Sequence, residues 1–230
     1  MYIAAVSKTG ERLEKIYGAM FSHFGGQNWW PAETAFECVA GAILTQNTAW
    51  TNVEKAIKNL KNSAKLTVRG IDDMPLSRLA RLIKPSGYFN QKSKRLKIFA
   101  RFVTQNYGGE IDALLAEETG KLRETLLSLE GIGPETADSI TLYAAGKPSF
   151  VVDAYTKRIT SRHGLSDEKA AYGDVQKLFE KNLPRDVEMW GEYHALIVRT
   201  AKLFCHKRKP DCENCPLRAD LPPGGAKTVG

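Results

Sequence analysis

Several features that mark other classes of protein are missing from this 230-residue sequence. No apolar run approaches the length of a membrane span, and the amino terminus lacks the basic-then-apolar pattern of a secretion signal. The chain has no internal repeat and no low-complexity block, and cysteine is scarce, with four residues in all. These absences favour a cytoplasmic protein with no membrane partner.

The overall composition is that of an ordinary globular protein, with 43% apolar and 26% charged residues. The length allows one sizeable core or two small lobes. A net charge of +7 favours a polyanionic partner, although many basic proteins bind no nucleic acid. Charge therefore points in one direction without deciding the function.

Apolar residues recur at helical spacing along nearly the whole chain, which predicts an all-α fold. The only extended stretch expected is 149–152, and Thr34 or a neighbour is expected to cap the second helix. The predicted helices cover approximately 8–24, 36–44, 50–60, 76–83, 88–101, 111–115, 122–129, 154–163, 170–182 and 189–204, and a further helix begins at Pro134.

The most informative stretch is a glycine turn between two of these helices. Gly131 and Gly133 flank Ile132, so the backbone can turn sharply and approach another surface closely. Pro134 follows, at a position that suits the first residue of a helix. Backbone N–H groups at such a turn attract a phosphate, although the turn could equally join two helices without binding any ligand.

The segment after this turn contains a Gly/Pro loop, Gly146-Lys147-Pro148, and an acidic residue, Asp153. With the turn, these residues resemble the helix-hairpin-helix motif, loop and essential aspartate of the endonuclease III superfamily of DNA glycosylases. The resemblance extends from about residue 8 to Cys215. Taken alone, Asp153 could simply be a helix N-cap.

The resemblance implies a two-lobed helical fold, with one lobe formed by 27–147 and the other by 1–26 plus 148–230. The groove between the lobes would hold the hairpin on one side and Asp153 at its mouth. Double-stranded DNA with a damaged base is the implied partner of a monomeric enzyme. The hairpin residues expected to bind DNA are Gly131, Ile132, Gly133 and Thr136. A monovalent cation is a further possible ligand of the hairpin.

In such an enzyme Asp153 would stabilise positive charge on the sugar and position or activate water. Bifunctional members of the superfamily carry a lysine two residues after the second hairpin glycine, where this chain has Glu135. A carboxylate cannot form a Schiff base, so the sequence predicts a monofunctional glycosylase without abasic-site lyase activity. Lys147 and Lys157 lie nearby in sequence, but neither matches the lysine position.

Other segments of the sequence are similar to those of the bacterial 3-methyladenine DNA glycosylases within this superfamily. Trp29, Trp30 and Pro31 correspond to a region that lines the base pocket there, and Glu135 is a further pocket candidate. Cationic alkylated purines leave easily and stack well on aromatic rings. Each tryptophan could instead be a core residue.

Flipping a base out of the duplex leaves a gap that a side chain has to fill. The resemblance assigns this role to Gln46 and Tyr88. Gln46 could instead be a helix C-cap, and Tyr88 could instead be a buried ring. Lys92, Lys94 and Arg95 follow on a basic helix, where they could meet phosphates or form a solvated face.

Three cysteines, Cys205, Cys212 and Cys215, resemble the superfamily's iron–sulfur loop, which has the pattern C-x6-C-x2-C-x5-C. The fourth position is Leu221, so a [4Fe–4S] cluster would need another ligand, with Asp220 the nearest candidate. The alternatives are a labile cluster, zinc with His206 as a ligand, and relic cysteines. Cys38 lies alone in an apolar run and is expected to be buried.

The sequence therefore predicts a DNA base-excision glycosylase, with alkylated purines such as 3-methyladenine as the expected substrates. One alternative is a glycosylase for oxidised pyrimidines or for thymine or uracil opposite guanine. Another is a DNA-binding module without catalysis, against which Asp153 argues.

Overall fold

The computed structural model describes residues 7–227, and the regular secondary structure of these residues is helical. The described residues contain no β-strand, so the all-α prediction is confirmed. The chain forms two compact units, one of Met1–Trp29 with Pro148–Gly230 and one of Trp30–Lys147. Residues 1–6 and 228–230, which belong to the lobe expected from 1–26 plus 148–230, lie outside the described residues.

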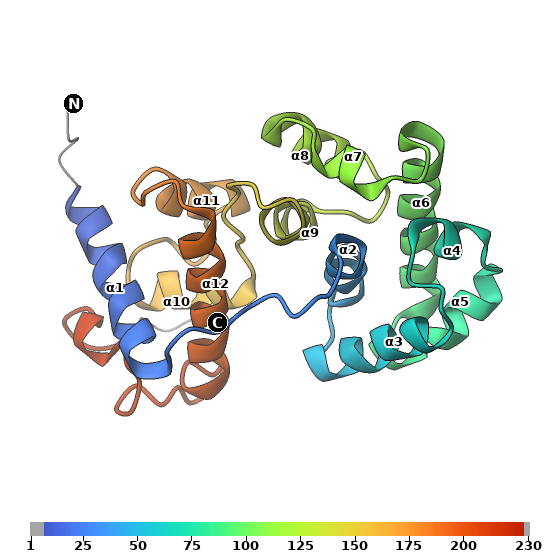
Figure 1. Cartoon of the computed structure of the whole chain (residues 1–230). Helices are drawn as coiled ribbons and strands as arrows, with labels where there is room; N and C mark the ends of the chain where they lie inside the picture. Colours follow the sequence, from blue (N-terminus) through green and yellow to red (C-terminus); the bar gives the residue numbers. More distant parts are fainter. Residues whose placement is uncertain (1–6, 228–230) are drawn as a thin grey trace. The chain divides into compact units, whose positions relative to one another are not determined.

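The unit Trp30–Lys147 is built around one buried helix. All residues of α2 from Phe36 to Leu44 are buried, because this segment is apolar on every side apart from Glu37. The Glu37 carboxylate is paired with Lys61 Nζ at 2.8 Å. The helical elements of this unit, coloured from blue to yellow-green in Figure 1, are α2 (Ala35–Leu44), α3 (Trp50–Asn62), α4 (Val68–Asp73), α5 (Leu76–Leu82), η1 (Lys84–Ser86), α6 (Phe89–Tyr107), α7 (Ile111–Leu115), α8 (Thr119–Leu127), α9 (Pro134–Ser139) and η2 (Ile140–Ala144).

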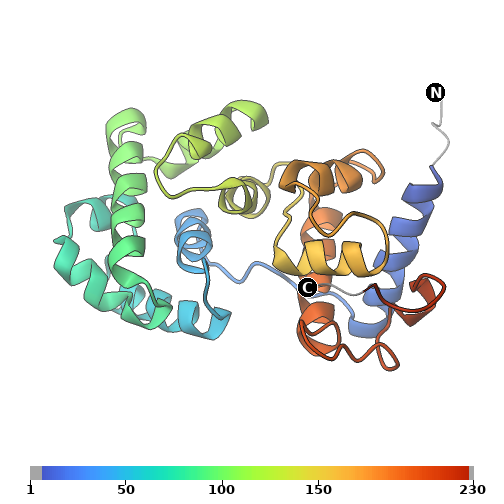
Figure 2. The ribbon, with the colours of Figure 1, turned by 180° about the vertical axis from the view of Figure 1, so that it is seen from behind.

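The other unit packs α1 and α10 against α12, which lies in front of α10 in Figure 1 and behind it in Figure 2. The Phe150 and Phe179 rings stack at 4.0 Å in its core, and Tyr193 meets both edge-on. The helical elements here are α1 (Lys8–Phe24), α10 (Ala154–Arg162), α11 (Tyr172–Glu180), α12 (Val187–Leu203) and η3 (Arg218–Asp220).

The extended segment 149–152 is not a strand, because its backbone bonds to side chains instead of to a neighbouring strand. Phe150 N–H donates to Glu180 Oε1, and Phe150 O accepts from Gln176 Nε2, both at 2.9 Å. These α11 side chains satisfy polar groups that a sheet would otherwise pair. They hold the segment that leads into Asp153.

Two features of the unit Trp30–Lys147 do not follow from the helical periodicity. The short helix α4 is absent from the predicted set, although its N-cap Thr67 accepts a bond from Gly70 N–H. The second hairpin helix changes from α-helical to π-helical geometry at Ile140. Single π turns of this kind occur frequently at functional sites.

Candidate active site

Asp153 is the N-cap of α10, as its sequence position predicts. Its Oδ1 accepts bonds from Thr156 N–H at 2.7 Å and from Thr156 Oγ1 at 2.9 Å. Its Oδ2 lies 3.6 Å from Nε2 of His194 on α12. The Asp153 side chain is 13% exposed. The carboxylate is therefore held at a helix start with one edge still open to solvent.

The surroundings of Asp153 keep it ionised. Burial alone would raise the pKa of Asp153, but the nearby imidazole of His194 and the donors of Thr156 outweigh burial and lower it below its ordinary value. The carboxylate is thus an anion at neutral pH. A fixed anion of this kind can stabilise positive charge that develops on a neighbouring group.

His194 has no counterpart among the residues expected from the sequence. It lies on α12, far from Asp153 along the chain, and no motif marks it. A lone histidine on an otherwise buried helix face reads as a core residue. Only the packing of α10 against α12 brings the imidazole to the carboxylate.

The glycine turn adopts the conformation that its residues predict, but part of it faces inward. Gly131 has φ +84°, and a Cβ there would collide with the Arg95 side chain, so glycine is required. Ile132 is 6% exposed, and its N–H donates to Leu129 O. The Ile132 side chain therefore packs into the interior, and a contact between this turn and DNA stays a prediction. Gly133 remains exposed.

The first turn of α9 divides its side chains between surface and interior. Glu135, at the position of the superfamily lysine, is exposed. Thr136 is buried, and its Oγ1 accepts a bond from Gln46 Nε2 at 2.9 Å. The Thr136 side chain thus supports the hairpin from inside, and the DNA contact expected at this residue stays a prediction.

Gln46 ties the turn after α2 to the hairpin. Besides its bond to Thr136, Nε2 donates to Gly131 O at 3.1 Å, and Oε1 accepts from Arg95 Nη1. The Gly131 carbonyl, which a cation at the hairpin could have used, already has a donor. Gln46 is therefore not a simple helix C-cap, and its side chain would have to break these hydrogen bonds to fill the gap left by a flipped base.

Tyr88 is exposed and held in a strained conformation. Its side chain is 67% exposed, so the buried-ring alternative is wrong. Its backbone is left-handed, with φ 44°, immediately before α6. Such a conformation is unfavourable for a residue with a bulky side chain and is typical of functional loops. The geometry leaves the ring available to an external partner.

Lys92 does not lie on a basic surface. It is 1% exposed, and its Nζ donates to Leu44 O at 2.8 Å and to Ser86 O at 2.7 Å. Burial, with a smaller contribution from the charge of Arg95, lowers the pKa of Lys92 to about 8. The amine joins the loops that carry Gln46 and Tyr88, so the expected phosphate contact is wrong.

We expect Lys92→Met to lower the free energy of unfolding by about 1–3 kcal/mol, because buried carbonyl acceptors lose their donor. Lys94→Met, an exposed position on the same helix, is the matched control. Unfolding in urea at pH 7 measures both variants. Equal stability of Lys92→Met and the parent would contradict the role of Lys92 as a buried tie.

The effect of Lys92 also has a defined pH dependence. Its folded pKa of about 8 lies below the unfolded value of 10.5. Between these values the unfolded chain binds a proton that the native amine has released, so stability rises with pH. The difference in free energy of unfolding between the parent and Lys92→Met should therefore increase as pH rises from about 8 to 10.5.

Trp30 lies against α2 beside a second tryptophan. A Cβ at Gly41 would lie 3.1 Å from Trp30 Nε1, so the indole rests on the helix backbone. Trp50 meets Trp30 at 5.1 Å and 86°, and Tyr143 lies 5.2 Å from it. A cavity of about 300 Å³ is lined by Trp30, Pro31, Glu37, Trp50, Glu54 and Lys61, among others.

The two predicted pocket tryptophans line different cavities. Trp29 belongs to the other unit, where it lines a hollow with Gln27 and the α12 residues Ala195 and Arg199. Trp50, which sequence reasoning missed, is the aromatic partner of Trp30. Its aromatic character directly after the turn at 45–48 is the signal that could have indicated it.

The cysteine loop brings the three predicted ligands to one place. Cys205, Cys212 and Cys215 line a single cavity together with Leu221, the residue at the missing fourth position. Arg162 Nη1 donates to Cys205 Sγ at 3.1 Å. Cysteine sulfurs are the usual ligands of iron–sulfur clusters. The donor set therefore fits three sites of a cluster.

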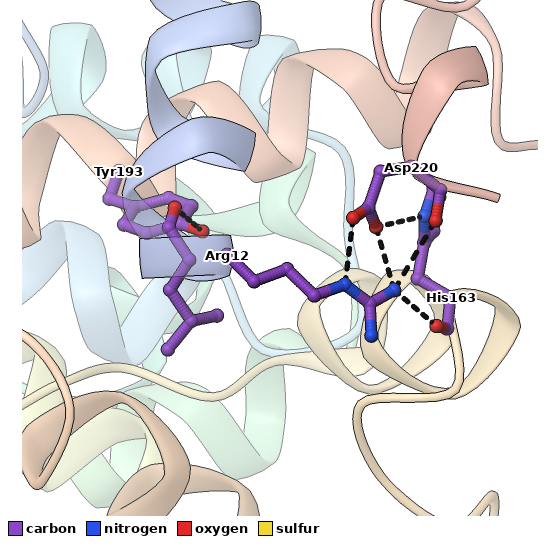
Figure 3. A network of polar contacts seen from close by, with 5 residues as sticks. Arg12, His163, Tyr193 and Asp220 are labelled. Carbon is purple, nitrogen blue, oxygen red and sulfur yellow. Dashed lines mark hydrogen bonds and ion pairs between the residues drawn. The ribbon is translucent and has the colours of Figure 1, made fainter. Parts of the chain in front are cut away.

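The other ligands considered for this loop are placed elsewhere. Figure 3 shows that Asp220 instead binds Arg12, with Nε–Oδ1 at 2.7 Å, and lies 2.9 Å from His163 Nδ1. Arg12 thereby joins α1 to the loop, near the bond from Tyr193 Oη to Leu13 O. Asp220 as fourth ligand is therefore wrong.

A single zinc ion is also a poor match for the loop. His206 is exposed and does not line the cavity of the cysteines. Within residues 7–227, no three His, Cys, Asp or Glu side chains are arranged around one point as a single metal ion requires. Cys38 is buried in α2, and burial, followed by the charge of Glu37, raises its pKa to about 12.

The sequence pattern of the HhH-GPD superfamily of base excision DNA repair proteins matches residues 40–185. The chain belongs to this superfamily. The match covers more than half of the chain and includes the hairpin, the loop and Asp153. The chain is accordingly a DNA base-excision repair glycosylase of the HhH-GPD superfamily.

Two relatives of the HhH-GPD chain match it over most of their own length. A protein of Methanocaldococcus jannaschii, described as a candidate DNA repair glycosylase, is 52% identical over 209 residues, covering 90% of this chain and 94% of its own. Endonuclease III of Thermotoga maritima is 30% identical over 183 residues, covering 80% of each chain.

Solved structures agree with the HhH-GPD fold. The Helicobacter pylori 3-methyladenine DNA glycosylase bound to 1,N6-ethenoadenine superposes with a TM-score of 0.73 at 29% identity, covering 85% of this chain and 98% of the other. An endonuclease III–DNA complex superposes with a TM-score of 0.80 at 22% identity, covering 95% and 97%. The latter shows the fold alone.

No helix within residues 7–227 is both long and apolar enough to cross a membrane.

Proposed function

We propose that this protein releases alkylated purines, such as 3-methyladenine, from double-stranded DNA by hydrolysis and has no abasic-site lyase activity. The observation that carries the proposal is an ionised, helix-capping Asp153 in a chain with Glu135 at the lysine position. The protein would act as a monomer on DNA in the cytoplasm.

The reaction requires one bond to break and one to form. The C1′–N bond breaks, and its electron pair leaves with the base. The Asp153 carboxylate stabilises the positive charge left on the sugar. Water adds to C1′ and loses a proton, which Asp153 would accept and pass to solvent. The products are the free base and an abasic site.

The Trp30–Trp50 cavity supports the choice of a cationic purine. Its volume of about 300 Å³ lies at the lower end of small-molecule sites. Aromatic faces attract cations. The two carboxylates of the lining, Glu37 and Glu54, are balanced by Lys58 and Lys61, so the support comes from the tryptophan rings. An alkylated purine already carries positive charge, so it needs little help to leave. The H. pylori glycosylase of similar structure is named for 3-methyladenine.

A panel of duplexes, each with one lesion, tests the proposal. We expect release from duplexes containing 3-methyladenine or 7-methylguanine, and little from those containing thymine glycol or a G·T or G·U mismatch. The opposite order would favour the second candidate, a glycosylase for oxidised or mismatched pyrimidines, to which the similarity with endonuclease III points. Release from none of the duplexes would contradict both.

We also propose that Cys205, Cys212 and Cys215 hold an iron–sulfur cluster of the [4Fe–4S] type with one iron that lacks a cysteine ligand. When bound, the cluster would tie together the basic loop that contains Lys207 and Lys209. Its role would be structural, since the proposed hydrolysis transfers no electron.

Iron and acid-labile sulfide should accompany protein purified without oxygen, with the visible absorbance of a cluster. Cys212→Ser should lose iron, whereas Cys38→Ser should keep it, because Cys38 lies in the core of the other unit. Leu221→Cys should slow loss of the cluster in air. Parent protein free of iron and sulfide would refute the assignment.

A further inference from the structure

His194 is the side chain from a neighbouring helix that meets the Asp153 carboxylate. Its side chain is 8% exposed, and Nε2 approaches Oδ2 at 3.6 Å. The charged or titratable group facing Asp153 from α12 is His194, and the neutral Thr156 faces it from α10. The two carboxylate oxygens therefore have separate partners.

This division leaves one oxygen for chemistry. Oδ1 has two donors from Thr156 and is committed to the start of α10. Oδ2 makes the longer contact, so it is the oxygen that can face a developing charge while Oδ1 caps the helix. An imidazole at that distance limits where Oδ2 can go. It also favours the anion over the protonated acid.

We propose that His194 is the positioning residue of Asp153, holding Oδ2 in place and keeping the carboxylate ionised while the base leaves. The inference rests on the proposed hydrolytic function, because it assigns the role of a second residue to the same site. His194 forms no bond to the substrate in this scheme. Its contribution is the orientation and charge state of its partner.

The proposal predicts a shift in pH dependence. The low pKa of Asp153 means that its anion persists until pH falls through that value. Without His194, the donors of Thr156 still oppose the effect of burial, but the pKa of Asp153 should be higher than in the parent. Base release should then be lost at a higher pH than in the parent. If His194 only filled space, replacing it would lower the free energy of unfolding without changing the pH at which base release is lost.

The experiment compares His194→Gln and His194→Phe with the parent. Single-turnover base release is measured across the acid range, and the Asp153 carboxyl is titrated by carbon-13 NMR in protein without DNA. We expect the acid limb and the NMR midpoint to rise together by about one pH unit. His23→Gln, an exposed histidine of α1, is the matched control and should leave both unchanged.

The NMR titration separates this inference from the proposed function. An unchanged Asp153 midpoint in both folded variants would overturn the positioning role of His194, whatever their activity. A raised midpoint in the two variants, together with a parent protein that releases no base from any duplex, would support the His194–Asp153 coupling and refute the proposed function instead. Thermal unfolding establishes that each variant is folded.

Discussion

Asp153→Asn should abolish base release while leaving DNA binding intact. The substitution removes the negative charge that would stabilise the sugar cation, and the loss of such a group costs about 10²–10⁴-fold in rate. The amide oxygen can still accept the bond from Thr156 N–H, and asparagine caps helices about as well as aspartate. The variant should therefore fold and bind.

Single-turnover release from alkylated duplex and binding to undamaged duplex measure the two effects separately. Asp186→Asn is the matched control, because Asp186 caps α12 in the same unit through a bond from Met189 N–H. The control should release base at the parent rate. If Asp153→Asn kept parental activity, the catalytic role of Asp153 would be wrong.

Glu135→Lys should give the protein a reactivity that the parent lacks. A lysine amine at this exposed position could attack C1′, displace the base and, after proton loss and ring opening, form an imine with the sugar. Borohydride then delivers hydride to the imine and leaves a stable secondary amine. The parent should yield no trapped complex, whereas the variant should yield one on abasic-site or lesion DNA.

The two lysines nearby in sequence donate hydrogen bonds to backbone carbonyls. Lys147 Nζ donates to Glu117 O, and Lys157 Nζ donates to Ala170 O at 3.1 Å. Glu135→Gln, which supplies no imine-forming amine, should not be trapped. Glu124→Lys adds the same charge at an exposed position of α8 and controls for stronger DNA binding. A trapped complex with the parent would show that another amine acts as nucleophile.

Local chemistry explains which parts of the fold follow from the sequence. The helix α1 has the bounds that its apolar spacing predicts. Thr34 accepts a bond from Glu37 N–H, and Asp153 accepts one from Thr156 N–H, as capping residues do. Each of these features depends on residues within one or two turns, so the pattern along the chain is enough.

The local pattern is insufficient where a side chain has two physically reasonable environments. Lys92 lies on a helix rich in lysine and arginine, yet its amine bonds to two carbonyls in the interior. Ile132 and Thr136 lie in a turn that looks exposed, yet their side chains face the core and Gln46. Sequence spacing gives the turn but not the direction in which these side chains point.

The amino-acid sequence was sufficient for the superfamily, the helical class, the glycine turn and the capping aspartate, because each is encoded by residues close together in the chain. The partner of that aspartate, the pairing of Trp30 with Trp50 and the diversion of Asp220 to Arg12 come from residues far apart in sequence. Long-range packing selects one neighbour from many compatible ones, and no local pattern records that choice.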